Sequence, residues 1–449
     1  MTNKILLTLI IAFVINANAQ KTERQNFNFS LQQAIEYAQK NNYKSINAGR
    51  DIESSKQKKW ETTAIGLPQL NGKVDFLHNF NLQKQGVSGN AFNPMGSPDD
   101  IATIAFGTKN TMIATATLSQ LIFDGSYIVA LQASKAYLQF FENAKKKTDN
   151  DIKEMIINAY GNVLLAEASI NILESNKTIL EKNYNDINQI YKNGLGEQES
   201  VEQIAITLET VKSSLNNVTR LREISLKMLK INLGIEINDD LKLTDNLDDL
   251  SKSNLELALT KSEFNVENNI EYQIATSIVT QKRLLMKLEK SKALPSLGAA
   301  FNIGYNSFAN DFNFLKTNQK WNNFSNVGVS LNVPIFSSFG HGAKVQQAKI
   351  AFEQAQTQQK EAEQMLKLGY EKAKSDFDFS IEQYATAKNN LSLAERIEKK
   401  QQIKFKEGLS TSFEFSEAQR QLYSAQQTYL QSMVDIINKK AALEKLVIK

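Results

Sequence analysis

The stretch Tyr191-Lys192-Asn193-Gly194-Leu195 recurs 214 positions later as Phe405-Lys406-Glu407-Gly408-Leu409. Three more landmarks recur in the same order: Leu67-Pro68 returns as Leu294-Pro295, Ile122-Phe123 as Ile335-Phe336, and Leu233-Gly234-Ile235 as Leu446-Val447-Ile448. Solenoid repeats have periods of about 20 to 50 residues, so this period is far too long for a solenoid. The pattern indicates a tandem duplication in which each copy carries a helix, two strands, a very long helix, a glycine turn and a return helix.

The N-terminal residues 1–19 have the pattern of a secretory signal peptide. Lys4 supplies the positive charge, residues 5–15 are apolar apart from Thr8, and Ala17-Asn18-Ala19 forms a small-residue cleavage site. A bilayer-spanning helix needs roughly 20 apolar residues, so this segment is too short, although a retained anchor is the alternative. The chain contains no cysteine, which excludes disulfides and lipid attachment at a cysteine.

The composition favours long helices and excludes several function classes. Only 5 prolines occur in 449 residues, and the formal net charge is +4. No segment is basic enough to indicate nucleic-acid binding. His78 and His341 have no second ligand at metal-binding spacing, so no metal, no cofactor and no enzyme activity are predicted. No stretch after residue 19 is expected to cross a membrane as a helix, which leaves a periplasmic protein, a secreted protein or an outer-membrane β-barrel.

Four segments alternate apolar and polar residues as β-strands do, at about 70–82, 110–122, 297–307 and 326–335. Each has about 10 to 12 residues, the length that a tilted strand needs to cross a bilayer. One face is apolar and the other carries Asn, Gly, Ser and Thr, as in a barrel with a wet lumen. An ordinary half-buried soluble sheet has the same alternation. A barrel needs about eight strands, so strands that span a membrane must be shared among several copies.

Very long helices are predicted over 127–192 and 343–406, because no proline interrupts either segment. The return helices, 197–233 and 412–446, carry heptad-like apolar positions, in the first copy Val201, Ile204, Leu208, Val211, Leu215 and Val218. These helices are expected to pack as coiled coils, either in a wide tube or in an elongated bundle without a tube. The first repeat is expected over 20–235 with its tip at 193–196, a connector over 236–254, and the second repeat over 255–449 with its tip at 407–411.

These motifs together resemble the TolC-like outer-membrane efflux (outer-membrane factor) family over essentially the whole mature chain. The helix-to-strand transitions of that family match Pro68 and Pro295. Its strand-to-helix motif, Leu-x-Gln-Pro-hydrophobic-Phe-Asp-Gly, matches residues 118–125, ending at Gly125, and residues 331–336, which include Pro334. Leu121 replaces the motif's proline in the first copy, so the strand is expected to continue further there. The resemblance implies a homotrimer with a long periplasmic α-helical barrel and one 12-stranded β-barrel, to which each chain gives four strands.

The resemblance also implies roles for individual residues. The tips Gly194-Leu195 and Gly408-Leu409 match the turns that dock a periplasmic adaptor, and Glu414 with Glu417 match a carboxylate pair that lines the periplasmic constriction. The alternative for the carboxylates is an ordinary solvated helix face. The family's tyrosine and arginine near the second tip are Phe405 and Ser410 here, so the hydrogen-bonded latch of that family is absent in that form.

The predicted function is therefore an outer-membrane exit duct of a tripartite efflux or type I secretion system in a Gram-negative bacterium. It is a passive channel opened by an adaptor (membrane fusion) protein and an inner-membrane pump of the RND or ABC type, with outer-membrane lipid around its strands. The alternative is a periplasmic or secreted coiled-coil scaffold with a small soluble β-sheet. The sequence does not specify the cargo or the class of pump.

Overall fold

The computed structural model describes residues 25–89, 91, 95, 97–254 and 264–447, and the predicted signal peptide, residues 1–19, lies outside these ranges. The chain divides into two compact units. The helical unit comprises residues 1–49, 144–272 and 363–449, and the sheet unit comprises residues 50–143 and 273–362. Each unit therefore contains segments from both halves of the chain.

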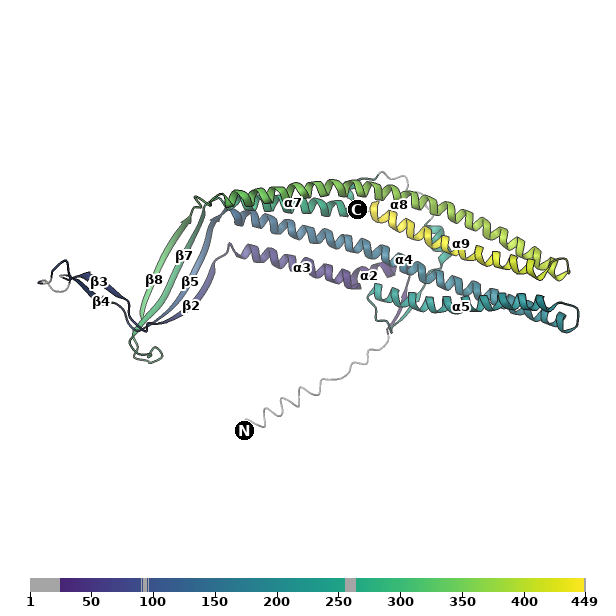
Figure 1. Cartoon of the computed structure of the whole chain (residues 1–449), viewed down its shortest axis with the longest axis horizontal. Helices are drawn as coiled ribbons and strands as arrows, with labels where there is room; N and C mark the ends of the chain where they lie inside the picture. The colour runs from purple at the N-terminus through teal and green to yellow at the C-terminus, as the bar shows by residue number, and fades with distance from the viewer. Residues whose placement is uncertain (1–24, 90, 92–94, 96, 255–263, 448–449) are drawn as a thin grey trace, which may run out of the picture. The chain divides into compact units, whose positions relative to one another are not determined.

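The helices and strands of the first half follow the predicted order (Figure 1). They are β1 (Asn26–Phe29), α2 (Leu31–Asn41), α3 (Tyr43–Ala64), β2 (Gln69–His78), β3 (Lys84–Ser88), β4 (Ile101–Ala105), β5 (Asn110–Asp124), α4 (Gly125–Lys192), α5 (Gln198–Leu233), β6 (Asp240–Leu243) and α6 (Leu247–Ser253).

The second half repeats this order with closely matching helix lengths. Its elements are the short 3-10 helix η2 (Val266–Asn268), α7 (Ile270–Ser291), β7 (Ser296–Ala309), β8 (Asn322–Asn332), α8 (Gly340–Lys406) and α9 (Ser412–Val447). Helices α3 and α7 have 22 residues each, α4 and α8 have 68 and 67, and α5 and α9 have 36 each. Pro68, Pro295 and Pro334 each lie between a helix and a strand, where a missing N–H disturbs neither element.

The sheet unit is built on an antiparallel sheet of four strands in the order β2-β5-β7-β8. The central pairing, β5 with β7, joins the two halves of the chain. Strands β2 and β8 lie at the edges, and within the described part of the chain neither has a second strand partner. Each edge strand therefore presents a row of backbone N–H and C=O groups that the chain alone does not pair.

The pairing register separates the sheet into an apolar face and a polar face. Residues opposite each other on neighbouring strands point to the same side. The apolar face comprises Leu70, Val74, Phe76, Met112, Ala114, Ala116, Leu118, Phe301, Ile303, Tyr305, Val327, Val329 and Leu331. The polar face carries hydrogen bonds from Thr117 Oγ1 to Asn302 Oδ1 (2.6 Å) and from Asn302 Nδ2 to Asn326 Oδ1 (2.9 Å).

Three strands have ends that differ from the sequence prediction. β2 ends at His78 and not at Leu82, because the last paired residues are His78 and Asn110. β8 begins earlier, at Asn322, and ends at Asn332, two residues before Pro334, which has no N–H for the ladder. β5 continues to Asp124 through an irregularity between Leu121 and Phe123, as expected where Leu121 replaces the proline.

Two strand pairs and one helix break were not predicted. β1 pairs in parallel with β6 across the whole first half, and the segment between β2 and β5 contains the hairpin β3–β4. The helical segment at the start of the first repeat breaks at Asn42, whose amide donates to Asn232 O at 2.6 Å. Gly234 packs so closely there (φ 80°) that a Cβ atom would lie 2.2 Å from Asn41 O.

The core of the helical unit surrounds Tyr160 of α4, which is fully buried. Its hydroxyl donates to Phe29 O at 3.0 Å and lies 3.1 Å from Asp245 Oδ2, so it connects α4 to the β1–β6 pair. Burial raises the pKa of Tyr160 well above its usual range. The hydroxyl therefore stays protonated and remains a hydrogen-bond donor.

One helix corrects the expectation that no later stretch resembles a transmembrane helix. Part of α4 is apolar enough to cross a membrane by length and composition, and 50% of that part is buried inside the chain. Ile152, Ile156 and Leu164 of α4 belong to the buried core, which accounts for this composition without a membrane.

We predict that Tyr160→Phe lowers the opening free energy of the β1–β6 pair by about 1 to 3 kcal/mol, because Phe29 O and Asp245 lose a buried donor. Hydrogen–deuterium exchange at the β6 amides measures this change. Tyr137→Phe is the matched control, since Tyr137 is 42% exposed. Equal exchange in the two variants would show that the Tyr160 hydroxyl does not hold this pair.

Candidate functional site

The two hairpin tips have the same backbone geometry. α4 ends at Lys192, Gly194 takes a left-handed conformation (φ 75°), and Leu195 N donates to Ile190 O at 3.0 Å. At the second tip Gly408 has φ 69° and Leu409 N donates to Lys404 O at 2.8 Å. This is the glycine C-cap of a helix, in which glycine avoids the penalty that a Cβ atom would bring.

The turns leave both tip leucines pointing away from their own hairpins. Leu195 is 82% exposed and Leu409 is 77% exposed. Both leucines are therefore accessible to another molecule.

The predicted constriction carboxylates both have local partners, in α9 or in the turn just before it. Glu414 Oε2 accepts from Thr411 N and Ser410 Oγ, both at 2.9 Å, while Glu414 N donates to Thr411 Oγ1 at 3.2 Å. This reciprocal pair is a capping box at the start of α9. Glu417 forms an ion pair with Arg420 one turn further along. Both side chains thus help the helix locally, whatever they also do in an assembly.

The hydrogen bond from Thr411 N, followed by that from Ser410, lowers the pKa of Glu414 below its usual value. The folded pKa is thus below the unfolded one, so the capping contribution is fully present above the ordinary carboxyl range. It is lost as the pH falls through the folded pKa. Crowding of acids in an assembly would act in the opposite direction and raise the pKa.

The two positions that differ from the family's latch make contacts inside the second hairpin. Phe405 of α8 stacks on Phe415 of α9, with ring centroids 5.3 Å apart, and Phe415 is 1% exposed. Ser410 Oγ lies 3.1 Å from Gln401 Oε1 and 2.9 Å from Glu414 Oε2, so its single hydrogen has two acceptors within reach. Both side chains therefore make their contacts inside the second hairpin.

A polar seam, which the sequence reasoning missed, lies between α4 of the first hairpin and α9 of the second. Asn176 Nδ2 donates to Gln426 Oε1 at 2.9 Å, and Ser169 Oγ lies 3.4 Å from Gln427 Oε1. Asn183 and Gln419 follow seven residues further toward the tips on the two helices. The seven-residue spacing of Ser169, Asn176 and Asn183 was the available signal. We define the polar seam as Ser169, Asn176, Asn183, Gln419, Gln426 and Gln427.

The Asn183–Gln419 level of the seam is buried but incompletely hydrogen-bonded. Gln419 is 1% exposed and Asn183 is 8% exposed. Among the described residues, Asn183 Nδ2 and both amide atoms of Gln419 lack a partner within hydrogen-bond geometry. The half-buried Glu398 of α8 lies nearby; burial raises its pKa, although Gln419 favours the charged form.

The contacts within the first hairpin, by contrast, are apolar. Helices α4 and α5 pack through one cluster formed by Leu173, Leu180, Leu208 and Val211. Nearer the tips, a second cluster adds Phe415 of α9 to Ile187 and Ile204. The first hairpin is thus held mainly by hydrophobic burial, with an ion pair between Arg222 and Glu167 at 2.6 Å, and the boundary between the two hairpins combines amides with apolar contacts such as that of Phe415.

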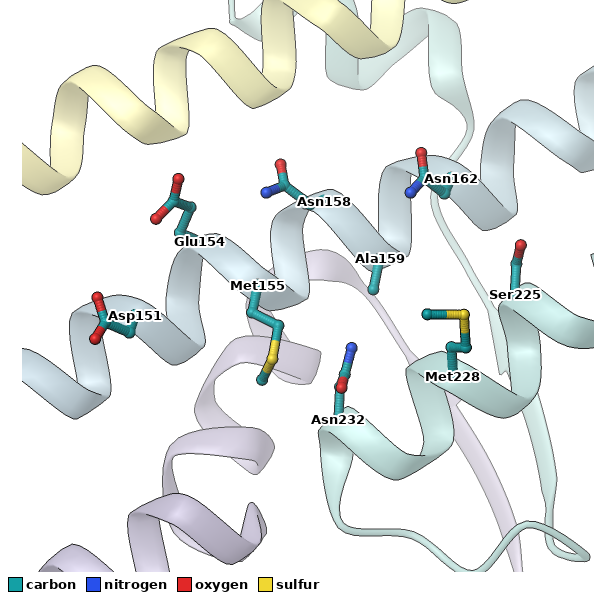
Figure 2. A pocket seen from close by; sticks show the side chains of 9 residues that line it. All are labelled: Asp151, Glu154, Met155, Asn158, Ala159, Asn162, Ser225, Met228 and Asn232. Atoms are coloured by element: carbon teal, nitrogen blue, oxygen red, sulfur yellow. The ribbon is translucent and has the colours of Figure 1, made fainter. Parts of the chain in front are cut away.

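The helical unit also contains a cavity of about 350 Å³ between α4 and α5 (Figure 2). Figure 2 shows Glu154 and Met155 pointing to opposite sides of α4. The carboxylates of Asp151 and Glu154 both pair with Lys445, at 2.7 and 2.9 Å. These carboxylates therefore form ion pairs between α4 and α9.

Solved structures with this fold are outer-membrane channels. The chain is similar to the CmeC outer membrane channel of Campylobacter jejuni, with a TM-score of 0.72 and 18% identity over 93% of this chain and 85% of that one. It is also similar to CusC (TM-score 0.73, 16% identity, 96% and 95% covered) and to the outer membrane protein VceC of Vibrio cholerae (0.70, 15%, 93% and 95%). At these identities the similarity establishes the fold: that of the outer-membrane factor channels, mainly helical with a β part.

The sequence of the second half also matches a family model. Residues 275–447, from α7 to α9, match the model of the family described as outer membrane efflux protein. The resemblance predicted from the duplicated motifs is therefore confirmed. A search of the curated proteins finds no match.

We predict opposite effects for two substitutions one heptad apart in the seam. Asn183→Leu removes a buried Nδ2 group that has no hydrogen-bond partner among the described residues and should raise the opening free energy of the seam. Asn176→Leu leaves Gln426 without its donor and should lower that free energy. A difference of about 1 to 3 kcal/mol is expected, from the cost of an unsatisfied buried polar group. Hydrogen–deuterium exchange at the α9 amides measures it, and effects of the same sign would contradict the assignment.

Proposed function

We propose that this chain forms the outer-membrane exit duct of a tripartite efflux or type I secretion system in a Gram-negative bacterium. The observation that carries the proposal is the four-stranded sheet with one apolar face, one polar face and two unpaired edges. In lipid an open strand edge is prohibitively costly, so β8 of one copy must pair with β2 of the next. Three copies close a 12-stranded barrel, with lipid on the apolar face and water on the polar face.

The exposure of the apolar face argues against the alternative of a soluble scaffold. Val327, Val329 and Leu331 are 75%, 67% and 65% exposed on one edge strand. A soluble protein rarely leaves so continuous an apolar surface in water, whereas a membrane protein requires it. Aromatic side chains gather at the loop end of the same face, where Phe76 contacts Phe312 and Phe314 at centroid distances of 5.5 and 6.0 Å. Aromatic residues are enriched at membrane interfaces.

The helices of three copies form the periplasmic tunnel, which is a passive conduit. The energy comes from an inner-membrane pump of the RND or ABC type, reached through a periplasmic adaptor that contacts Leu195 and Leu409. Glu414 and Glu417 line the constriction near the second tips, in addition to their local contacts.

The assembly is tested in mild detergent and in planar bilayers. The full-length mature protein should run as a trimer and show discrete conductance steps, because only a closed barrel satisfies the edge strands. A monodisperse, water-soluble monomer would instead support the scaffold alternative.

The tips are tested with the double variant Leu195→Asp, Leu409→Asp. Charged side chains at both exposed turns should abolish adaptor binding and efflux, while trimer assembly and bilayer conductance remain. The control is Leu368→Asp, because Leu368 is a comparably exposed leucine (66%) in α8 that lies away from the tips. Full efflux by the double variant would exclude docking through these leucines.

The acidic pair is tested by measuring ion selectivity. Glu414→Gln with Glu417→Gln should weaken the preference for cations and relieve block by divalent cations from the periplasmic side, because a narrow acidic ring attracts cations. Glu361→Gln serves as the control, because Glu361 is a carboxylate of α8 that lies far along the chain from the second tip. Unchanged reversal potentials in the double variant would show that the two residues have only their local roles, the capping box of Glu414 and the ion pair of Glu417.

A further inference from the structure

A groove lies between the end of α7 and the start of α8 in the sheet unit. One cavity of about 490 Å³ is lined by Glu289, Lys292, His341, Lys344, Ile335 and Phe336, among others. A second cavity of about 410 Å³ shares Glu289, Lys292 and Lys344 and adds Lys282. We call the two together the transition groove, because it adjoins the segment in which β8 gives way to α8.

The segment beside the groove exposes large apolar side chains. Ile335, Phe336 and Phe339 are 92%, 76% and 84% exposed. Ile335 continues the alternate apolar positions of β8, after Leu331 and Val333, beyond the end of the strand. The apolar face that the proposed function assigns to lipid therefore continues to the rim of the groove.

The backbone of this segment is strained in a way that the first copy avoids. Ser338 and Phe339 have φ values of 48° and 63°, and among the described residues they are the only non-glycine residues with positive φ. In the first copy Asp124 accepts from Ser126 N and Tyr127 N at 2.7 and 3.1 Å and caps α4. Strained conformations persist where the surroundings demand them and often mark a functional site. In this backbone conformation the Phe339 ring lies edge-on to the Phe336 ring, with ring centroids 6.0 Å apart.

The polar part of the groove offers both signs of charge. Lys292 Nζ pairs with Glu289 Oε1 at 2.6 Å, and Glu289 Oε2 is buried with no hydrogen-bond partner among the described residues. Lys344 has no carboxylate within ion-pair distance in the described part of the chain. The groove thus has an available cation for a phosphate and an available acceptor for an ammonium.

We propose that the transition groove binds a membrane phospholipid whose headgroup carries a phosphate and a primary ammonium. Lys344 contacts the phosphate, Glu289 Oε2 accepts from the ammonium, and Ile335, Phe336 and Phe339 contact the acyl chains. A quaternary ammonium has no N–H for Glu289, and a glycerol headgroup has no cation, so both should bind less well. The inference rests on the proposed function, because it places the apolar face in a bilayer.

The test uses the full-length trimer reconstituted with equal amounts of phosphatidylethanolamine, phosphatidylglycerol and phosphatidylcholine, followed by native mass spectrometry of the retained lipids. Phosphatidylethanolamine should be retained preferentially, up to one molecule per chain. Glu289→Gln should reduce that preference about tenfold, and Lys344→Gln should weaken retention of all three lipids, because each removes a charge-assisted hydrogen bond. Lys349→Gln is the control, since Lys349 pairs with Glu353 at 3.6 Å and does not line the groove.

The wild-type comparison needs no variant and is decisive if a variant fails to assemble. Equal retention of the three headgroups would overturn the proposal, as would displacement of the lipid by millimolar inorganic phosphate, which would assign the groove to free phosphate. A trimer that conducts but shows no headgroup preference refutes the lipid site alone. A protein that does not enter bilayers refutes the proposed function as well.

Discussion

The unpaired backbone groups along β2 and β8 constrain the rest of the structure. A strand edge in water can hydrogen-bond to solvent, but an edge in lipid has no such partner. Four strands are too few to bend into a closed barrel, so in the proposed membrane assembly other copies of the chain pair with the edges. The apolar face, the aromatic residues at its loop end and the prolines at the helix–strand transitions all accord with this one requirement.

Different kinds of contact hold different parts of the helical unit together. The first hairpin is held by buried leucines, isoleucines and valines, which lose much free energy if exposed to water. The boundary between the hairpins carries the amides of Asn176, Asn183, Gln419 and Gln426, which water can solvate. The same boundary also contains apolar contacts, between Ile187 and Phe415 near the tips and between α4 and α9 in the core around Tyr160. Amides and buried apolar side chains therefore hold the two hairpins together at different levels.

Local rules predicted most of the elements but not the contacts between distant segments. The long helices followed from the absence of proline, the strands from period-two alternation, and the tips from Gly-Leu at helix ends. β1 was missed because four residues pair with a strand 214 positions away, which no local pattern reveals. The acidic pair was found by its spacing from Gly408, but its capping and ion-pair contacts depend on Thr411 and Arg420, which the spacing argument did not consider. The polar seam could be recognised only by knowing that α4 and α9 pack side by side.

The open edges also affect how the protein reaches its destination. If the proposed barrel is correct, a newly exported chain would carry two unpaired strands and an exposed apolar face through an aqueous compartment, where such surfaces promote aggregation. Closure by three chains would then have a rate that rises steeply with the local concentration of unassembled chains. When synthesis is slow, each single chain therefore waits longer for its partners and is exposed to aggregation for longer. A carrier protein that covers β2 and β8 until three copies meet would prevent this aggregation.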